Sequence, residues 1–125
     1  QFGPTLMFDV SLPISKMEEY VANVNNNLNK YWKNFNFIVW GHLADGNLHL
    51  VAGVGDLQEK TIKKIERSIY DPLEIIGGSV SAEHGIGIEK KPYLHLSRTK
   101  EEINYMKILK KTFDPKMILN PDLIF

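Results

Sequence analysis

The fold is decided by the stretch FNFIVWGHLADGNLHLVAGV (35–54), which contains two apolar runs separated by a turn signal. The runs Phe35–Leu43 and Asn47–Val54 have the length and composition of β-strands. Between them, Asp45-Gly46 favours a two-residue hairpin turn, because both residue types tolerate a positive φ angle. We therefore predict an antiparallel hairpin in this part of the chain.

A strand and two helices are predicted around this hairpin. Thr5–Leu12 predicts a strand, and a helix follows from Ser15, whose spacing to Glu18 is that of a capping box. A second helix is predicted over 57–76, where Pro72 should kink or restart it and Gly77-Gly78 should end it. Each helix carries an apolar stripe at helical spacing: Met17, Val21, Val24, Leu28 and Tyr31 in the first, and Ile62, Ile65, Ile69, Leu73 and Ile76 in the second.

The C-terminal part of the chain predicts a strand, a loop and a helix. Ser79–Ala82 is a short strand, and the glycine-rich loop His84–Ile88 follows it. Thr99 and Glu102 have capping-box spacing and begin a helix that ends at Asp114-Pro115, before an extended tail over Met117–Phe125. The order βαββαβ, with an extra C-terminal helix and tail, predicts one α+β domain over residues 1–125 with ferredoxin-like topology.

Composition excludes several classes of protein. The 125 residues include 15 basic and 15 acidic side chains, so there is no net positive charge to attract nucleic acid or an anionic membrane. No apolar run reaches the roughly 20 residues that span a bilayer. The chain contains no cysteine, which removes zinc–thiolate and disulfide chemistry and is compatible with the cytoplasmic location that we expect.

Two histidines of the predicted hairpin can share a metal ion. If Asp45 and Gly46 alone form the turn, His42 lies directly opposite His49, and paired side chains point to the same face of a sheet about 5 Å apart. The alternative is a pair of polar residues on a solvent-facing surface.

A second cluster, Ser81-Ala82-Glu83-His84-Gly85-Ile86-Gly87, places a carboxylate and an imidazole beside glycines that let a ligand approach the backbone. Glu83 would complete a His-His-carboxylate metal site, and His84 would remain free as a base. The alternative is a polar strand end with a flexible loop. We expect the neighbouring charges, Glu89, Lys90 and Lys91, to be solvated, and His95 to have no role in chemistry.

These segments carry a resemblance to a known family. GHLADGNLHL (41–50), GGSVSAEHGIGIEKKPYL (77–94) and DPKMILNPDLIF (114–125) resemble, in this order, signature segments of the FAD-linked oxidase C-terminal domain. That family includes D-lactate, D-2-hydroxyglutarate and glycolate dehydrogenases. The resemblance extends, with gaps, from about Phe8 to the last residue.

The resemblance implies a role for each residue of the site. The two histidine ligands of the family fall on His42 and His49, its glutamate ligand on Glu83 and its general base on His84, while Asn120 matches a position near the flavin and the substrate. It also implies that the chain is the second half of a duplicated ferredoxin-like domain, and that the FAD-binding domain lies outside it. We therefore expect that this chain by itself binds no FAD and is inactive.

Two positions depart from relatives that act on dicarboxylic hydroxy acids. Such relatives tend to have asparagine where this chain has Val51, and lysine where it has Met7. D-2-hydroxyglutarate is therefore a doubtful substrate, and a broader class of 2-hydroxy acids remains.

The expected enzyme is an FAD-linked 2-hydroxy-acid dehydrogenase or oxidase. A divalent metal would lower the pKa of the substrate hydroxyl, His84 would take its proton, and hydride would pass to FAD. Zinc suits the ligand set best, and manganese or iron would be tolerated.

The expected partners are the small-molecule substrate, the FAD-binding domain and a second copy in a homodimer. A stand-alone metal-binding or ligand-binding module without catalysis is the alternative, and a purely structural domain is a weaker one.

Overall fold

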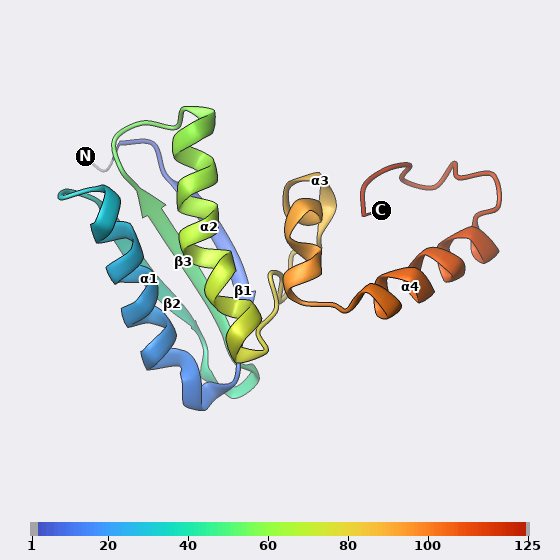
Figure 1. The fold of residues 1–125 in the computed structure, drawn as a ribbon, viewed down its shortest axis with the longest axis horizontal. Coiled ribbons are helices and arrows are strands. Elements are labelled where there is room, and N and C mark those ends of the chain that lie inside the picture. Colours follow the sequence, from blue (N-terminus) through green and yellow to red (C-terminus); the bar gives the residue numbers. More distant parts are fainter. Residues whose placement is uncertain (1–2, 125) are drawn as a thin grey trace.

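A three-stranded antiparallel sheet with two helices packed on one face forms the body of the domain (Figure 1). The structure, a computed structural model, describes residues 3–124. The elements that position the site are β1 (Leu6–Ser11), α1 (Met17–Tyr31), β2 (Asn36–His42), β3 (Asn47–Gly53), α2 (Glu59–Ile76), α3 (Gly87–Lys90) and α4 (Lys100–Phe113). Among the described residues, no helix has both the length and the apolar character needed to cross a membrane.

The sheet separates an apolar core from a polar face. Its strand order is β1-β3-β2, and side chains alternate between the two faces along each strand. Phe8 and Val10 of β1 and Leu50 of β3 pack in the core with Val24 of α1 and Ile69 of α2. Neither α1 nor α2 covers the opposite face, on which the predicted histidines lie (Figure 1).

Helix α1 begins two residues later than the sequence predicts. The capping box of Ser15 and Glu18 is wrong, because Ile14–Lys16 form a short 3-10 turn after Pro13 and the helix begins at Met17. The apolar stripe is correct at Val24 and Leu28 but not at Tyr31, which is exposed, whereas Tyr20 is buried and donates a hydrogen bond from its hydroxyl to the carbonyl of Ile69.

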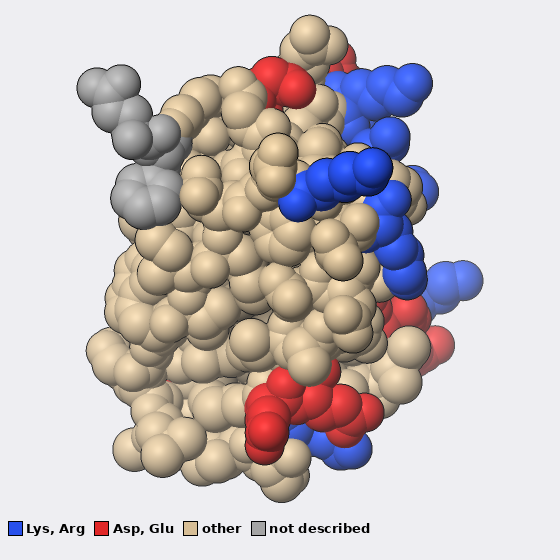
Figure 2. Space-filling view, turned by 90° about the vertical axis from the view of Figure 1, so that its left-hand side faces the viewer, with Lys and Arg blue, Asp and Glu red and all other residues tan. Residues whose placement is uncertain are grey.

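Polar residues cover the outer side of α1. Its asparagines at 23, 25, 26 and 29 are exposed. Figure 2 looks at the side of the molecule on which α1 lies and shows charged side chains toward the top, right and bottom of this view, with uncharged residues over its centre and left.

Helix α2 continues through Pro72 without interruption. The predicted restart is wrong, because the residues around the proline, Ile69 and Leu73, are fully buried and hold the last turns against the sheet. The predicted end is correct: Gly77 adopts a left-handed conformation with φ 68°, and its amide donates to the carbonyl of Glu74.

The hairpin register differs from the prediction by two residues. His42 pairs with Asn47 and Trp40 pairs with His49, because Leu43–Asp45 form a 3-10 turn and Gly46 follows with φ 74°, so that the loop has four residues instead of two. A carboxylate oxygen of Asp45 accepts a hydrogen bond from the amide of Asn47 and fixes this loop. A shift by two residues leaves each side chain on its predicted face, because the repeat of a strand is two.

The predicted fourth strand is reduced to one bridge. Ser79 pairs with Ser11 at the outer edge of β1, but residues 80–82 form no ladder with the sheet: Val80 is buried in the apolar core, and the amide of Ala82 donates to Asp9. The C-terminal helix α4 begins with the predicted capping box, in which Thr99 and Glu102 exchange hydrogen bonds.

Helix α4 contributes no buried residue to the described part of the domain, and it extends away from the sheet (Figure 1). The predicted extended tail is wrong, because the chain turns at Met117, Asn120 and Asp122, all with positive φ. The last residue of that predicted tail, Phe125, lies outside the described residues.

Two isoleucines of α2 test whether the core lies where the structure places it. Ile69 is fully buried and Ile75 is 88% exposed. We expect Ile69→Ala to lower the free energy of unfolding by about 2–5 kcal/mol, because the change leaves a cavity. Ile75→Ala should change it by less than about 0.5 kcal/mol. Urea denaturation followed by circular dichroism measures both, and equal effects would contradict the assigned core.

Candidate metal centre

The strand register places three potential ligands on the open face of the sheet. Asp9 of β1 pairs with His49 of β3, and His49 pairs in turn with Trp40 of β2. His42 lies two residues beyond Trp40 on β2, so its side chain points to the same face. The rings of His42 and His49 have their centroids 5.6 Å apart. The two histidines thus meet diagonally across the strands instead of directly.

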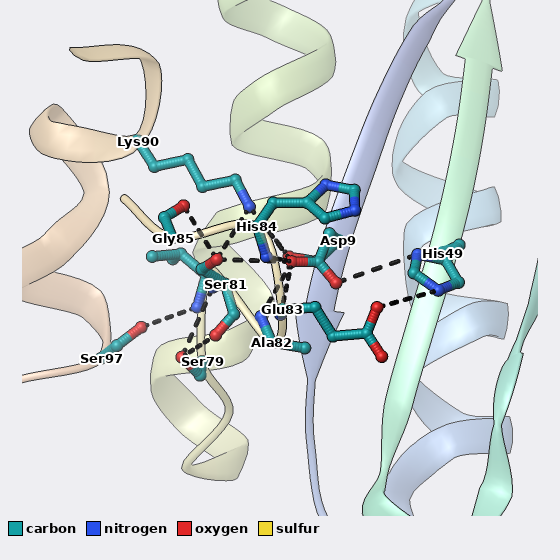
Figure 3. Close-up of polar contacts among 11 residues, drawn as sticks. Asp9, His49, Ser79, Ser81, Ala82, Glu83, His84, Gly85, Lys90 and Ser97 are labelled. Carbon is teal, nitrogen blue, oxygen red and sulfur yellow. Dashed lines mark hydrogen bonds and ion pairs between the residues drawn. The ribbon is translucent and has the colours of Figure 1, made fainter. Parts of the chain in front are cut away.

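The segment Ala82–His84 is attached to this face by Asp9. A single carboxylate oxygen of Asp9, Oδ2, accepts hydrogen bonds from three successive backbone amides, those of Ala82 (3.1 Å), Glu83 (2.9 Å) and His84 (2.9 Å). Figure 3 shows these bonds converging on Asp9 from the loop, with His49 on the other side of the carboxylate. The backbone of Glu83 and His84 is therefore fixed beside β1 and β3.

Glu83 completes a group of three metal-binding side chains with the two histidines. Its Oε1 lies 3.3 Å from His42 Nδ1 and its Oε2 lies 4.0 Å from His49 Nε2. One ligand atom from each of the three residues lies within 4.8 Å of the other two. This is the set that the sequence predicts, and the structure brings its members together from β2, β3 and the loop after Ser79.

Asp9, His49 and His84 form a second group by the same distance criterion. The imidazoles of His49 and His84 are stacked with their centroids 5.9 Å apart, and Asp9 Oδ1 lies 3.8 Å from His49 Nδ1. His49 is common to both groups, with one ring nitrogen toward Asp9 and the other toward Glu83.

Sequence reasoning missed Asp9. Its side chain is wholly buried, in the middle of the strand LMFDVS. Aspartate is depleted in strands, and an acidic residue between the core residues Phe8 and Val10 was the available signal.

Lys90 was also assigned wrongly. It was expected to be solvated, but it is 9% exposed, and its Nζ donates hydrogen bonds to the carbonyl of Asp9 (3.2 Å) and to Ser81 Oγ (3.1 Å).

Opposing effects set the charge of Asp9. Burial by itself would raise the pKa of this carboxyl, but the amides of His84 and Glu83, the Lys90 ammonium and the amide of Ala82 together lower the pKa to about 2. Burial lowers the pKa of Lys90, and the nearby Asp9 carboxylate opposes that effect. Asp9 is thus an anion at neutral pH in a site from which solvent is excluded.

The residues present fit a divalent metal ion. Asp9 Oδ1 and both polar atoms of the Asn47 side chain are buried without a hydrogen-bond partner among the described residues. Buried polar atoms are rarely left without a partner. Asp9 Oδ1 faces Nδ1 of His49 at 3.8 Å, so it can accept from an N–H there while the other ring nitrogen of His49 is free for a metal. Two imidazoles and a carboxylate form a donor set that suits zinc and also accepts manganese or iron.

The remaining predicted residues lie beside this centre or away from it. His84 and Asn120 line one cavity of about 370 Å³, together with Gly85, Ile86, Leu123 and Ile124. The base and the flavin-side residue that the resemblance implies therefore share a cavity, although they are far apart in sequence. His95 is exposed and belongs to neither metal-binding group.

Comparison with known proteins gives matches along almost the whole chain. The family described as "FAD linked oxidases, C-terminal domain" matches residues 3–124. D-2-hydroxyglutarate dehydrogenase of Stutzerimonas stutzeri (strain A1501) is 34% identical over 122 residues, which are 94% of this chain and 26% of that protein. The mitochondrial D-2-hydroxyglutarate dehydrogenase of Danio rerio is 36% identical, over 95% of this chain and 22% of its own length.

Glycolate oxidase subunit GlcD of Bacillus subtilis (strain 168) is 34% identical, over 97% of this chain and 26% of that protein. The chain thus spans about a quarter of the length of the curated relatives that it matches.

The low pKa of Asp9 predicts how stability depends on pH. A carboxyl whose pKa falls from 3.8 to about 2 on folding stabilises the protein above pH 4, and this contribution is lost as the pH falls toward 2. It amounts to about 2 kcal/mol. We therefore expect the free energy of unfolding of Asp9→Asn to fall less between pH 5 and pH 2 than that of the wild type, as measured by urea denaturation. Parallel pH profiles would contradict the assignment.

Proposed function

Because the chain belongs to the family of FAD-linked oxidase C-terminal domains, we propose that it is the metal-binding, substrate-side domain of an FAD-dependent enzyme that oxidises 2-hydroxy acids. The observation that carries this proposal is the convergence of His42, His49 and Glu83, next to His84 and the cavity that His84 lines. D-lactate, glycolate and D-2-hydroxyglutarate are the substrates that the family resemblance suggests.

His42, His49 and Glu83 would hold a divalent metal ion, with zinc as the best match to this donor set. When bound, the ion would supply Lewis-acid stabilisation of the substrate hydroxyl and carboxylate oxygens. The chain's own contribution is to hold the three ligands on a rigid sheet face. His49 is only 12% exposed, so the site is open to substrate on the side of His42 and Glu83.

His84 is the residue placed to move the proton. Its backbone is fixed to Asp9 through the hydrogen bond from its amide, while its side chain lines the cavity beside the metal-binding group. An imidazole exchanges protons readily near neutral pH, which suits a general base for a metal-activated hydroxyl. FAD would supply the redox chemistry. Asn120 lines the same cavity and is the residue that would face the flavin.

The surface next to this centre favours a substrate with an apolar or short side chain. Met7, Val51 and Ile38 pair across the sheet in the row that follows Asp9, His49 and Trp40. Met7 is 63% exposed and Ile38 is 46% exposed, so this row offers no charged group to a second carboxylate. We infer that the enzyme prefers monocarboxylic 2-hydroxy acids to D-2-hydroxyglutarate.

Five further expectations belong to the same proposal. The strand order β1-β3-β2, with Ser79 bridged to the outer edge of β1, supports a ferredoxin-like unit whose fourth strand is nearly lost. The chain would be the second half of a duplicated domain, and the FAD-binding domain would be its partner. Assembly into a homodimer and a cytoplasmic location stay predictions.

The alternative is a stand-alone module that binds a metal or a small ligand and catalyses nothing. The convergence of His42, His49 and Glu83 agrees equally well with such a module, because binding a metal ion requires no catalysis. His84 distinguishes the two functions, since a binding module needs no base beside its metal.

Metal uptake tests the ligand set. After zinc loading, we expect about one ion per chain in the wild type, because the three ligands form one site. His42→Ala and His49→Ala should retain far less zinc, as measured by elemental analysis and calorimetric titration. His95→Ala is the matched control, because it removes an exposed histidine that belongs to neither metal-binding group. Equal retention in all four proteins would reject the site.

Turnover tests the enzymatic role. In the complete FAD-loaded polypeptide that carries this chain, we expect oxidation of D-lactate and of larger apolar D-2-hydroxy acids with a higher kcat/KM than D-2-hydroxyglutarate. His84→Ala should lower kcat about 100-fold or more while metal content stays unchanged, because only the proton acceptor is lost. A metal-loaded wild type that turns over no 2-hydroxy acid would leave the binding module as the better assignment.

A further inference from the structure

We propose that Asp9 is the positioning residue of this metal centre, with a separate task for each of its two carboxylate oxygens. Oδ2 fixes the segment that carries Glu83 and His84, and Oδ1 determines which ring nitrogen of His49 faces the metal. This inference rests on the metal centre proposed above and extends it to a residue outside the ligand set.

The first task is shown by the hydrogen bonds of Oδ2. This atom accepts from the amides of Ala82, Glu83 and His84 at 2.9–3.1 Å, and Ser81 Oγ lies 3.3 Å from it. Three consecutive amides that point at one oxygen leave the backbone of 82–84 a single arrangement. The side chains of Glu83 and His84 therefore leave the loop in directions that Asp9 sets, although the loop has little regular structure of its own.

The second task follows from the position of Oδ1. It is buried, has no hydrogen-bond partner among the described residues, and lies 3.8 Å from His49 Nδ1. The other ring nitrogen, Nε2, lies 4.0 Å from Glu83 Oε2 on the metal-binding side (Figure 3). A carboxylate beside Nδ1 favours the tautomer with its proton there, and this leaves the lone pair of Nε2 free for a metal.

Lys90 holds the same carboxylate from the loop side. Its Nζ lies 3.5 Å from Asp9 Oδ2 and donates to the Asp9 carbonyl and to Ser81 Oγ. It thus places a positive charge beside the buried carboxylate and ties β1 to the loop. Lys90 lies in α3, directly after the glycine-rich loop, so the same short segment supplies both His84 and the cation beside Asp9.

Asp9 itself is a less suitable metal ligand than Glu83. Its side chain is 0% exposed, whereas that of Glu83 is 47% exposed and reaches the side from which an ion and a substrate would enter. An ion held between Asp9 and His49 Nδ1 would also require the opposite tautomer of His49, with the proton on Nε2. The tautomer of His49 therefore distinguishes a positioning role from direct ligation.

Zinc affinity of variants tests the first half of the inference. Asp9→Asn keeps an oxygen that can accept from the three amides but removes the negative charge beside His49. We expect it to remain folded by circular dichroism and to bind zinc about 10–100-fold more weakly than the wild type in a chelator competition assay. Asp56→Asn is the matched control, because Asp56 is exposed, accepts the amide of Gln58 and belongs to neither metal-binding group. Zinc affinity of Asp9→Asn equal to that of this control would overturn the inference.

Nitrogen-15 NMR of the histidines in the wild type tests the second half without any substitution. We expect zinc-loaded protein to show His49 protonated at Nδ1 and coordinated through Nε2, and zinc-free protein to show the same tautomer. Protonation at Nε2 in either state would overturn the inference, even if Asp9→Asn failed to fold. A wild type that binds no zinc would instead reject the proposed metal centre, so the two failures can be told apart.

Discussion

The carboxylate of Asp9 is the contact on which the arrangement of the site depends, because it joins a strand of the sheet to a segment more than seventy residues later. Asp9 sits on β1 with no solvent exposure, and its Oδ2 gathers the amides of Ala82, Glu83 and His84. A charge in this position is costly unless hydrogen bonds and a counter-charge compensate it. Those amides and Lys90 do so, and in doing so they attach the glycine-rich loop to the face that carries the histidines.

The two faces of the sheet differ: one packs against helices in the apolar core, and the other carries the polar side chains of the site. Core residues such as Val10 and Leu50 hold α1 and α2 against one side, and the alternation of each strand then places Asp9 and His49 on the other. The position of these two side chains is thus a consequence of core packing. A one-residue slip of β3 would expose Leu50 and bury His49, so the hydrophobic core protects the register of the site.

Much of the fold and of the candidate site could be predicted from the sequence, and the predictions that failed did so for physical reasons. The apolar spacing in α2 and the turn at Gly77 are local signals, and both elements form as predicted. The predicted register of the hairpin was wrong because Asp45-Gly46 also fits the end of a four-residue loop. Only the 3-10 turn over Leu43–Asp45 distinguishes the four-residue loop from the two-residue turn. The two histidines nevertheless stay on one face, since the error was an even number of residues.

The fourth strand and Asp9 could not be found in this way, for one shared reason. Residues 80–82 have a strand-like composition, but their amides bond to side chains instead of a strand. Two of these partners, Ser97 of Val80 and Asp9 of Ala82, are distant in sequence. Local strand propensity cannot detect a distant side chain that accepts these amide hydrogen bonds in place of a neighbouring strand. A lone aspartate in an apolar strand was the single sign of it, and that sign indicates burial without identifying the partner.

Exposure rises in steps across the centre, and this gradient suits a site that must be both preformed and accessible. Asp9 is 0% exposed and His49 12%, whereas Glu83 is 47% and His42 58% exposed. The inner pair is held by the sheet and by Lys90, so little conformational entropy remains to be lost there when a ligand binds. The outer pair keeps rotamer freedom and can adjust to an ion and to a substrate oxygen. In the proposed metal centre, the inner side would therefore keep its strand and loop fixed, while the outer side could change its coordination during a reaction.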